Sequence, residues 1–386
     1  MREPSLDLKT RRTMVRHLLA WFDRAKRPMP WRDTRDPYAI WLSESMLQQT
    51  QVATVIPYYH RFLQKFPTVH ALAAADLQDV LALWAGLGYY RRAKHLHEAA
   101  KQIVAQHAGQ FPKTAEALRA LPGVGRYTAG AVASIAFNQA TPVVDGNVMR
   151  VVSRLTLHDA DIADPKNHTF FWSFTQSLHD AIASKPPDYV RGAAPLSIRN
   201  GSRNALPLHP HGDLNQSLME LGATVCVPPP ARPACLMCPL RDHCRAAHTG
   251  RQLDFPVKSA KTKSPTVKRT AIVLLRDHHG QREVLLAQRP ADVLWQHMWD
   301  VPLVEDATPF SHLKPLKQKV VHILTHRRYE IRLLVGTSAA TPPQFPDYIA
   351  QRWVAWPLPS PAPLPISKLV HKILAIAFAQ PAKDSR

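Results

Sequence analysis

Apolar residues recur every three or four positions from residue 7 to about residue 225, and the breaks in this pattern carry proline and glycine. Such spacing gathers apolar side chains on one face of a helix, so this part of the chain is predicted to be all-α. Asp36 offers an N-cap, and Pro37 fits the first turn because its missing N–H would be unpaired there anyway. We therefore expect a helix from Pro37 toward Gln51.

The helical pattern then stops and a different one begins. Residues 186–213 gather Pro, Gly, Asn and Ser, which predicts a long surface loop. Residues 251–268 are rich in Lys, Ser, Thr and Pro and lack any period, which is typical of a linker. Beyond them, β-branched apolar runs predict strands at 270–275, 283–288 and 329–335, and helical spacing returns at 366–378. The C-terminal part is thus predicted to be α+β.

The composition indicates what kind of partner the protein binds. The 386 residues suggest two or three domains, and 45% apolar with 20% charged residues is ordinary for a globular protein. A net charge of +20 favours a polyanionic partner such as nucleic acid, although a solvated basic surface would give the same balance. The first residues carry both charge signs and do not resemble a signal peptide, so we expect a cytosolic protein.

A glycine-rich hairpin is the first motif with a clear chemical role. It reads Leu121-Pro-Gly-Val-Gly-Arg-Tyr-Thr-Ala-Gly130 and lies between two helical segments. Gly123 and Gly125 let the backbone turn tightly and approach a phosphate, which the N–H groups that open the next helix can bind. This is a helix-hairpin-helix signature; a plain turn between helices is the simpler alternative. Contacts of this kind position a protein on DNA without reading its sequence.

All four cysteines lie in one short window, with the spacing Cys226-x8-Cys235-x2-Cys238-x5-Cys244. Such crowding argues for a metal site in a reducing compartment rather than a disulfide scaffold. Four thiolates suit a tetrahedral zinc site or a [4Fe-4S] cluster, and the spacing alone does not decide between them.

Two carboxyl groups are candidates for catalysis. Ile40, Trp41 and Leu47 lie one helical turn from Glu44 and would bury its carboxyl. Burial raises the pKa of a glutamic acid toward the range of a general acid, whereas a salt bridge at the helix edge would keep it ionised. Asp145 precedes a predicted helix, so an N-cap is its simpler role, and the two roles are compatible.

Amides and aromatic residues near these motifs could enter a DNA duplex. Gln48, Gln49 and Gln51 follow Glu44, and Tyr89 belongs to the segment Gly86-Leu-Gly-Tyr-Tyr90. A protruding Gln or Tyr can fill the gap that an extruded base leaves. Tyrosines after a glycine are also common in protein cores.

Together these segments resemble the MutY family of adenine DNA glycosylases over nearly the whole chain. The resemblance rests on several separated motifs in the same order, which is more specific than any one of them. They are Trp31-Arg32, Trp41-Leu-Ser-Glu-Ser-Met-Leu-Gln-Gln-Thr50, Gly86-Leu-Gly-Tyr-Tyr90, Leu121-Pro-Gly-Val-Gly125, Val144-Asp-Gly-Asn-Val148 and Asn215-Gln-Ser-Leu-Met-Glu-Leu-Gly222.

The resemblance implies a role for each matching residue. Glu44 would protonate adenine at N7, Asp145 would stabilise the positive sugar, and Tyr127 and Asn147 would line this site. The flipped adenine would lie against Arg27, Met29, Trp31, Arg32 and Glu220, and DNA would be bound by Gln48, Gln49, Tyr89, Gly123 and Gly125. Recognition of 8-oxoguanine would involve Leu324, Thr325 and His326. A [4Fe-4S] cluster would be held by Cys226, Cys235, Cys238 and Cys244.

The same resemblance implies an organisation and a partner. It predicts a multidomain fold, with an all-α helix-hairpin-helix glycosylase core, a cluster loop and an α+β Nudix-like domain. The expected ranges are 1–225, 226–250, a linker at 251–268 and 269–386. The partner would be double-stranded DNA with adenine opposite 8-oxoguanine or guanine, and we expect a cytoplasmic, nucleoid-associated monomer. The C-terminal part lacks the run of acids and arginine of a Nudix box, so it is not expected to hydrolyse nucleotides.

Two alternatives belong beside this interpretation. The endonuclease III branch of the superfamily carries a Schiff-base lysine where this chain has Tyr127, and without that amine a lyase reaction loses its covalent route. A non-catalytic iron-sulfur redox sensor would need the cysteines and the hairpin but neither Glu44 nor Asp145. The sequence also departs from the family in three places: a longer spacing after Cys226, a longer loop at 186–213, and Leu324 where the 8-oxoguanine turn usually has Phe.

Overall fold

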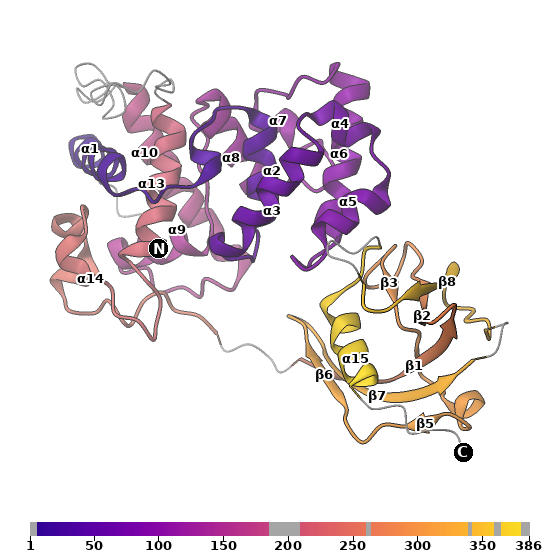
Figure 1. The fold of residues 1–386 in the computed structure, drawn as a ribbon. Coiled ribbons are helices and arrows are strands. Elements are labelled where there is room, and N and C mark those ends of the chain that lie inside the picture. Colours follow the sequence, from indigo (N-terminus) through magenta and orange to yellow (C-terminus); the bar gives the residue numbers. More distant parts are fainter. Residues whose placement is uncertain (1–5, 185–208, 260–263, 339–341, 359–363, 380–386) are drawn as a thin grey trace. The chain divides into compact units, whose positions relative to one another are not determined.

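The computed structural model describes residues 6–184, 209–259, 264–338, 342–358 and 364–379. By its contacts the chain forms two compact units. One comprises residues 1–59, 68–70 and 99–260, and the other comprises residues 60–67, 71–98 and 261–386. Figure 1 shows helices up to α14 (Arg245–His248) and a sheet with α15 (Lys368–Phe378) in the C-terminal part, which confirms the predicted change of fold class.

The helical part has the following elements. Its α-helices are α1 (Leu8–Ala25), α2 (Pro37–Leu47), α3 (Val52–Lys65), α4 (Val69–Ala74), α5 (Leu77–Trp84), α6 (Arg91–His107), α7 (Ala115–Leu118), α8 (Arg126–Phe137), α9 (Gly146–Thr156), α10 (His168–Ser184), α13 (Pro210–Thr224) and α14 (Arg245–His248). Short 3₁₀ helices lie at η1 (Pro30–Arg32), η2 (Pro165–Asn167), η3 (Cys235–Met237) and η4 (Arg241–His243). None of the helices in the described ranges combines the length and the apolar character that crossing a bilayer requires.

Two boundaries in the helical part differ from the sequence predictions. Helix α2 begins at Pro37 with Asp36 as its N-cap, as expected, but it ends at Leu47 rather than near Gln51. The predicted loop at 186–213 lies largely outside the described residues, and its last four residues already belong to α13, with Pro210 in the first turn. The proline that suggested a loop is therefore a helix start.

The predicted linker is ordered where it leaves the helical unit. The side chain of Phe255 is buried, and its carbonyl oxygen accepts a hydrogen bond of 3.0 Å from Arg154 Nε. Ile162 N donates to the carbonyl oxygen of Val257 at 3.0 Å. At its other end the range overlaps the first strand, which begins at Thr266.

Helix α13 organises the first unit by packing against α1, α8 and α9. Its buried Asn215 accepts a hydrogen bond from Val143 N at 3.0 Å and donates to the carbonyl oxygen of Thr141 at 2.8 Å. One amide thus fixes the segment that leads into α9. A Cβ on Gly222 would lie 2.6 Å from the Cβ of Asn147, so glycine is required for α13 to approach the start of α9 this closely.

The C-terminal sheet has eight strands in the described ranges, with the order β3-β2-β1-β7-β5 and with β4, β6 and β8 paired to β1, β7 and β2. Strands β1 and β7 run parallel, and the other pairs are antiparallel. The strands are β1 (Thr266–His278), β2 (Gln281–Gln288), β3 (Trp299–Asp300), β4 (Leu303–Val304), β5 (Lys314–Pro315), β6 (Val320–Ile323), β7 (Arg328–Thr337) and β8 (Ala350–Ala355).

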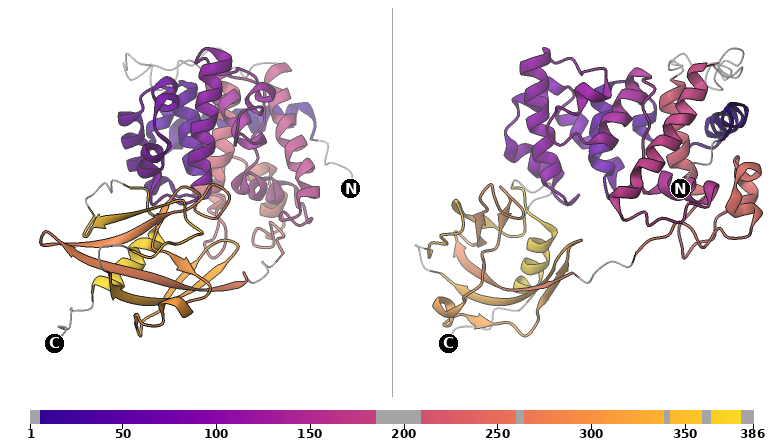
Figure 2. Two further views of the ribbon diagram at one scale, coloured as in Figure 1. Left: turned by 90° about the vertical axis from the view of Figure 1, so that its right-hand side faces the viewer. Right: turned by 180° about the vertical axis from the view of Figure 1, so that it is seen from behind.

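Both faces of this sheet are covered. Along β1, Ala271 and Val273 pack on the side of α15 (Lys368–Phe378), whereas Ile272 and Leu274 join a second cluster that contains Phe345. Alternate residues of a strand point to opposite faces, so this central strand is apolar at successive positions. The views in Figure 2 show α15 lying against the strands. The predicted strands and the final helix are confirmed within a few residues.

Candidate active site

Glu44 lies in the last turn of α2 and is only 5% exposed. Its neighbours Ile40 and Trp41 are buried as the helical spacing predicted. The hydroxyl of Tyr127, from the second residue of α8, donates a hydrogen bond of 2.8 Å to Glu44 Oε2. A second polar contact of the same hydroxyl reaches Met219 Sδ in α13 at 3.2 Å. Three helices thus meet around one carboxyl group.

The environment of Glu44 makes it a weak acid. Burial raises its pKa to about 7, the hydrogen bond from Tyr127 opposes this rise, and the nearby charge of Asp145 adds to it. The cation of Arg32 acts in the opposite direction. Protonated and ionised forms are then of similar abundance near neutrality, so the group can donate a proton and later accept one.

Asp145 is the N-cap of α9, as its sequence position suggested. One carboxylate oxygen accepts from Val148 N and the other from the side-chain amide of Asn147, both at 2.8 Å. Burial raises the pKa of Asp145, and these hydrogen bonds oppose the rise by stabilising the carboxylate. Its charge contributes to the raised Glu44 pKa, so the two carboxyl groups interact electrostatically. The capping role therefore coexists with a position beside the acid.

Arg150, which the sequence did not single out, connects this site to the cysteine loop. Its Nη2 donates 2.8 Å to Asn147 Oδ1 and 2.7 Å to the carbonyl oxygen of Gly222. Its Nε donates 2.7 Å to the carbonyl oxygen of Cys226. A continuous chain of hydrogen bonds thus runs from Asp145 through Asn147 and Arg150 to the backbone of the first cysteine. The partners are distant in sequence, so no local pattern signals this link.

A second buried glutamate, Glu220 in α13, has a different environment. Arg27 Nε and Nη2 bind its two carboxylate oxygens at 2.7 and 2.9 Å, and Arg32 Nη2 adds a bond of 2.9 Å. Burial alone would raise its pKa, but the hydrogen bonds from Arg27 and Arg32 lower it to about 2. Met29 and Trp31 of the same segment are buried, and Trp31 meets Tyr59 edge-on at 5.4 Å between ring centroids. The structure thus brings Arg27 and Arg32 of the predicted base pocket together around the Glu220 carboxylate.

The hairpin before α8 has the geometry of an anion site. Gly123 has φ 71°, a left-handed conformation that favours glycine. Gly125 is the N-cap of α8 and supplies no side-chain hydrogen bond, so the N–H groups of the first turn are open to an external acceptor. Both glycines are exposed.

The predicted DNA-inserting residues lie on turns of the two units. Gln48 is the C-cap of α2, and its side-chain amide donates a hydrogen bond of 3.2 Å to Thr128 Oγ1. Gln49 is exposed with φ 57°, so the chain reverses directly after the helix that carries Glu44. In the second unit Tyr89 has φ 50° and is 45% exposed. The Tyr89 hydroxyl lies 2.5 Å from Thr325 Oγ1, and the Arg92 guanidinium lies over the Tyr89 ring.

The four cysteines gather in the loop after α13. Burial raises the Cys238 pKa to about 12; a backbone hydrogen bond from Leu240 opposes the rise and the charges of the other three thiols add to it. Arg154 Nη1 donates 3.2 Å to Cys226 Sγ. Among the described residues, no three Cys, His, Asp or Glu side chains are placed to hold a single metal ion. The cysteine loop therefore supplies four soft donors, with a buried guanidinium beside the first of them.

The predicted 8-oxoguanine turn connects β6 and β7. Leu324 N donates 2.8 Å to the carbonyl oxygen of Arg327, which closes the turn. Thr325 and His326 at its tip are exposed, whereas Leu324 is half-buried.

Two family models match the chain. Residues 42–175 match the HhH-GPD superfamily of base excision DNA repair proteins, and residues 271–375 match the NUDIX domain. The adenine DNA glycosylase of Rattus norvegicus is 36% identical over 413 residues, covering 88% of this chain and 73% of the relative. The chain belongs to the adenine DNA glycosylase family. The Homo sapiens adenine DNA glycosylase is 45% identical over 263 residues, which cover 66% of this chain and 43% of that protein.

Membership in this family establishes a DNA N-glycosylase of base excision repair with a Nudix-like C-terminal domain, as the sequence motifs predicted.

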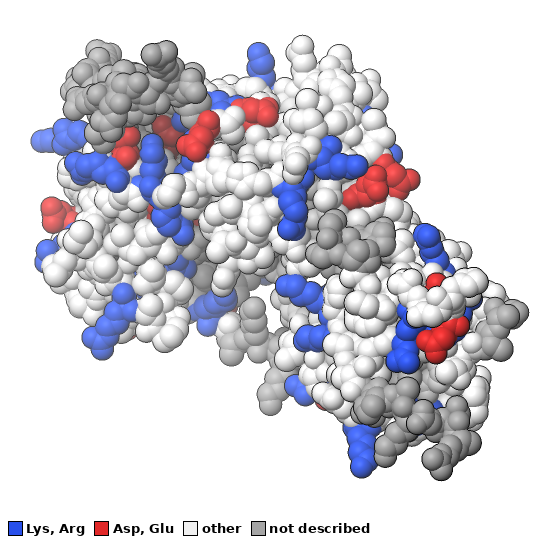
Figure 3. Space-filling model, viewed as in Figure 1, with Lys and Arg blue, Asp and Glu red and all other residues white. Residues whose placement is uncertain are grey.

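Among solved structures, that of a thermostable thymine-DNA glycosylase has a TM-score of 0.47 and 26% identity, covering 62% of this chain and 98% of the other. In the view of Figure 3, lysine and arginine side chains are spread over the described surface and acidic side chains are sparser.

Proposed function

We propose that this adenine DNA glycosylase removes adenine mispaired with 8-oxoguanine or guanine by hydrolysis, without efficient strand cleavage. The observation that carries the proposal is the buried Glu44, whose pKa is raised to about 7 beside a second carboxyl group. A neutral carboxylic acid can protonate a leaving base, and the neighbouring carboxylate can stabilise the positive sugar that remains.

In the proposed reaction, Glu44 transfers its proton to N7 of the flipped adenine. The bond between N9 and C1′ breaks and its electron pair leaves with the base, so the sugar becomes an oxocarbenium ion. Asp145 stabilises that cation. Water then adds to C1′ and gives its proton to the Glu44 carboxylate, which restores the acid. The 2.8 Å hydrogen bond from Tyr127 orients Glu44 throughout.

The absence of an amine nucleophile at Tyr127 supports a monofunctional reaction. Burial, followed by the neighbouring carboxylates, raises the Tyr127 pKa well above its ordinary value, so the phenol stays protonated. A neutral phenol that is committed to Glu44 forms no Schiff base with C1′.

Recognition of the mispair is assigned to three sets of residues. Arg27, Arg32 and Glu220 shape the pocket for the flipped base, with Met29 and Trp31 as its apolar wall. DNA is held by the hairpin glycines and entered by Gln48, Gln49 and Tyr89. Recognition of 8-oxoguanine falls to the β6–β7 turn at Leu324, Thr325 and His326.

We further propose that Cys226, Cys235, Cys238 and Cys244 hold a [4Fe-4S] cluster, the group that suits four thiolates in this family. Bound there, it would tie the loop after α13 to α9 and supply charge near the DNA. The chain's own contribution is the pair of buried arginines, Arg150 and Arg154, that bond to Cys226 and keep it in place.

The test uses duplexes that carry adenine opposite 8-oxoguanine, guanine or thymine, followed by alkali. Wild type should release adenine from the first two duplexes and leave the third intact, and Glu44→Gln should release it roughly 10²- to 10⁴-fold more slowly. Glu98→Gln, which removes a half-exposed surface carboxyl, is the matched control and should behave as wild type. A strong covalent adduct trapped by borohydride, or tight binding without base release by wild type, contradicts the proposal.

A further inference from the structure

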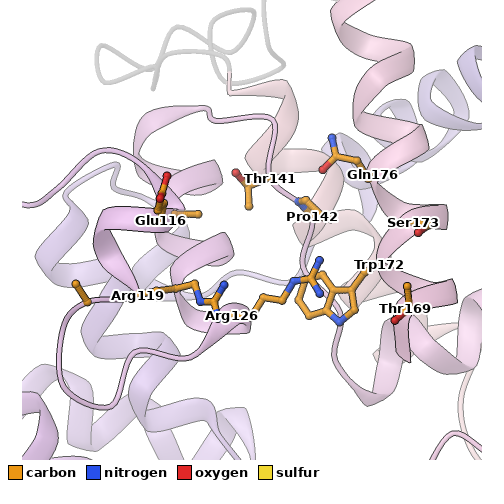
Figure 4. Close-up of a pocket in the computed structure, with 11 residues that line it drawn as sticks. Glu116, Arg119, Arg126, Thr141, Pro142, Thr169, Trp172, Ser173 and Gln176 are labelled. Carbon is orange, nitrogen blue, oxygen red and sulfur yellow. The ribbon is translucent and has the colours of Figure 1, made fainter. Parts of the chain in front are cut away.

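A pocket of about 910 Å³ lies in the first unit, apart from the residues assigned to the reaction. It is bounded by α7, by the start of α8, by the segment before α9 and by α10 (Figure 4). The lining of this pocket includes Glu116, Arg119, Arg126, Thr141, Trp172 and Gln176. None of its lining residues belongs to the catalytic site, the flipped-base pocket or the cysteine loop.

Two guanidinium groups face this pocket. Arg126 lies over the indole ring of Trp172, with its Cζ 3.9 Å from the ring centroid. Such a contact holds the guanidinium plane in one orientation. Burial, followed by the positive charge of Arg119, lowers the Arg126 pKa, so the two cations are close enough to repel each other.

No carboxylate balances this pair among the residues that the structure describes. Glu116 lines the same pocket, but Figure 4 shows its carboxyl pointing away from both guanidinium groups. Two adjacent cations without an acidic partner leave a place for an anion. Their planar donor groups suit the oxygens of a phosphate.

The rest of the lining suits a nucleotide rather than a bare anion. Thr141, Thr169 and Ser173 contribute hydroxyl groups and Gln176 an amide, which can bond a sugar or a base edge. The stacked Arg126 and Trp172 offer a flat surface of the kind on which bases stack. The volume accommodates a mononucleotide.

We propose that this pocket binds a nucleotide through its phosphate, with Arg119 and Arg126 as the phosphate ligands. The favoured source is the DNA strand on which the enzyme acts, and in this respect the inference rests on the proposed function. Arg126 directly follows Gly125 of the hairpin. A DNA strand with one phosphate bound by the hairpin N–H groups therefore runs past the pocket. The pocket would bind a neighbouring phosphate of the same strand and extend the contact with the DNA backbone.

The test measures affinity for an uncleavable duplex, with 2′-fluoroadenosine opposite 8-oxoguanine, between about 50 and 400 mM salt. The variants are Arg119→Gln, Arg126→Lys and the double variant with Gln at both positions. Each phosphate contact contributes roughly 0.9 to the slope of log affinity against log salt, so Arg119→Gln should make the slope shallower by about that amount. Arg126→Lys keeps the charge but loses the planar stack, and should weaken binding less. Arg16→Gln, an exposed arginine of α1, is the matched control and should leave the slope unchanged.

A second arm separates the two sources of phosphate. Deoxyadenosine monophosphate and inorganic phosphate are titrated into wild type and Arg119→Gln while tryptophan fluorescence is followed. A shallower salt slope in the variants supports DNA as the ligand, and saturable nucleotide binding that Arg119→Gln abolishes supports a free nucleotide. Unchanged slopes together with no nucleotide binding overturn the proposal. Wild-type release of adenine, assayed on the cleavable duplex, tests the proposed function separately, so the two can fail independently.

Discussion

Two buried glutamates in the same unit have opposite acid strengths. Glu44 and Glu220 are 5% and 1% exposed, yet burial raises the pKa of Glu44 to about 7, whereas Glu220 has a pKa of about 2. Glu44 accepts one hydrogen bond from a neutral phenol, whereas Glu220 is bound by two guanidinium groups. Burial alone therefore does not make a general acid. The number and charge of the donors decide which carboxyl carries a proton.

Substitution of Glu44 should have the largest effect on activity. Glu44→Gln keeps the shape of the side chain but has no proton to give, so adenine release should fall roughly 10²- to 10⁴-fold. Single-turnover release from a duplex with adenine opposite 8-oxoguanine measures it, with Glu98→Gln as control. A rate within a few-fold of wild type would mean that another group is the acid.

Removing the other carboxylate should affect stability. Glu220→Leu leaves Arg32, whose side chain is only 11% exposed, without its counter-charge, and should lower the free energy of unfolding by roughly 3 to 5 kcal/mol. Urea denaturation at pH 7 is the measurement. Asp254→Asn breaks an exposed ion pair with Arg251 and should cost less than about 1 kcal/mol. Equal losses for the two variants would remove the distinction between the buried pair and the surface pair.

The raised pKa of Glu44 should also make the stability of the protein depend on pH. Because the Glu44 pKa is raised from 4.5 to about 7, the folded protein holds this proton more tightly than the unfolded chain does. The associated stability is fully present below pH 4.5 and is lost as the pH rises to about 7. Relative to wild type, Glu44→Gln should therefore gain stability over this range, on the order of 3 kcal/mol. Parallel stability curves from pH 5 to pH 8 would contradict the raised pKa.

The smallest expected effect concerns Tyr127. Its hydrogen bond lowers the Glu44 pKa, so Tyr127→Phe should raise that pKa and move the alkaline fall of single-turnover activity toward higher pH. A fall at lower pH than in wild type would reverse the assigned role of the phenol.

The sequence predicted the parts of this site that depend on local spacing. The apolar turn around Glu44, the N-cap at Asp145 and the glycines of the hairpin are readable because their partners lie within a few residues. Even so, α2 ends at Leu47, because the chain reverses at the left-handed Gln49 rather than continuing the apolar period.

The links between distant segments could not be predicted in this way. Arg150 reaches Gly222 and Cys226, which lie 72 and 76 residues further along the chain. Arg27 and Glu220 are separated by 193 residues. Their pairing, and hence the low pKa of Glu220, depends on the packing of α13. The family resemblance indicated that these residues share a pocket but not that the arginines fix the carboxylate.

The most direct test of the central claim is an infrared titration of the Glu44 carboxyl group. The difference spectrum between wild type and Glu44→Gln isolates its carbonyl stretch, which disappears as the proton is lost. The carboxylic acid signal should persist through pH 6 and disappear with a midpoint near 7, as the raised pKa requires. A midpoint near the ordinary value of 4.5 would show that Glu44 is ionised at neutral pH and would contradict its role as the acid.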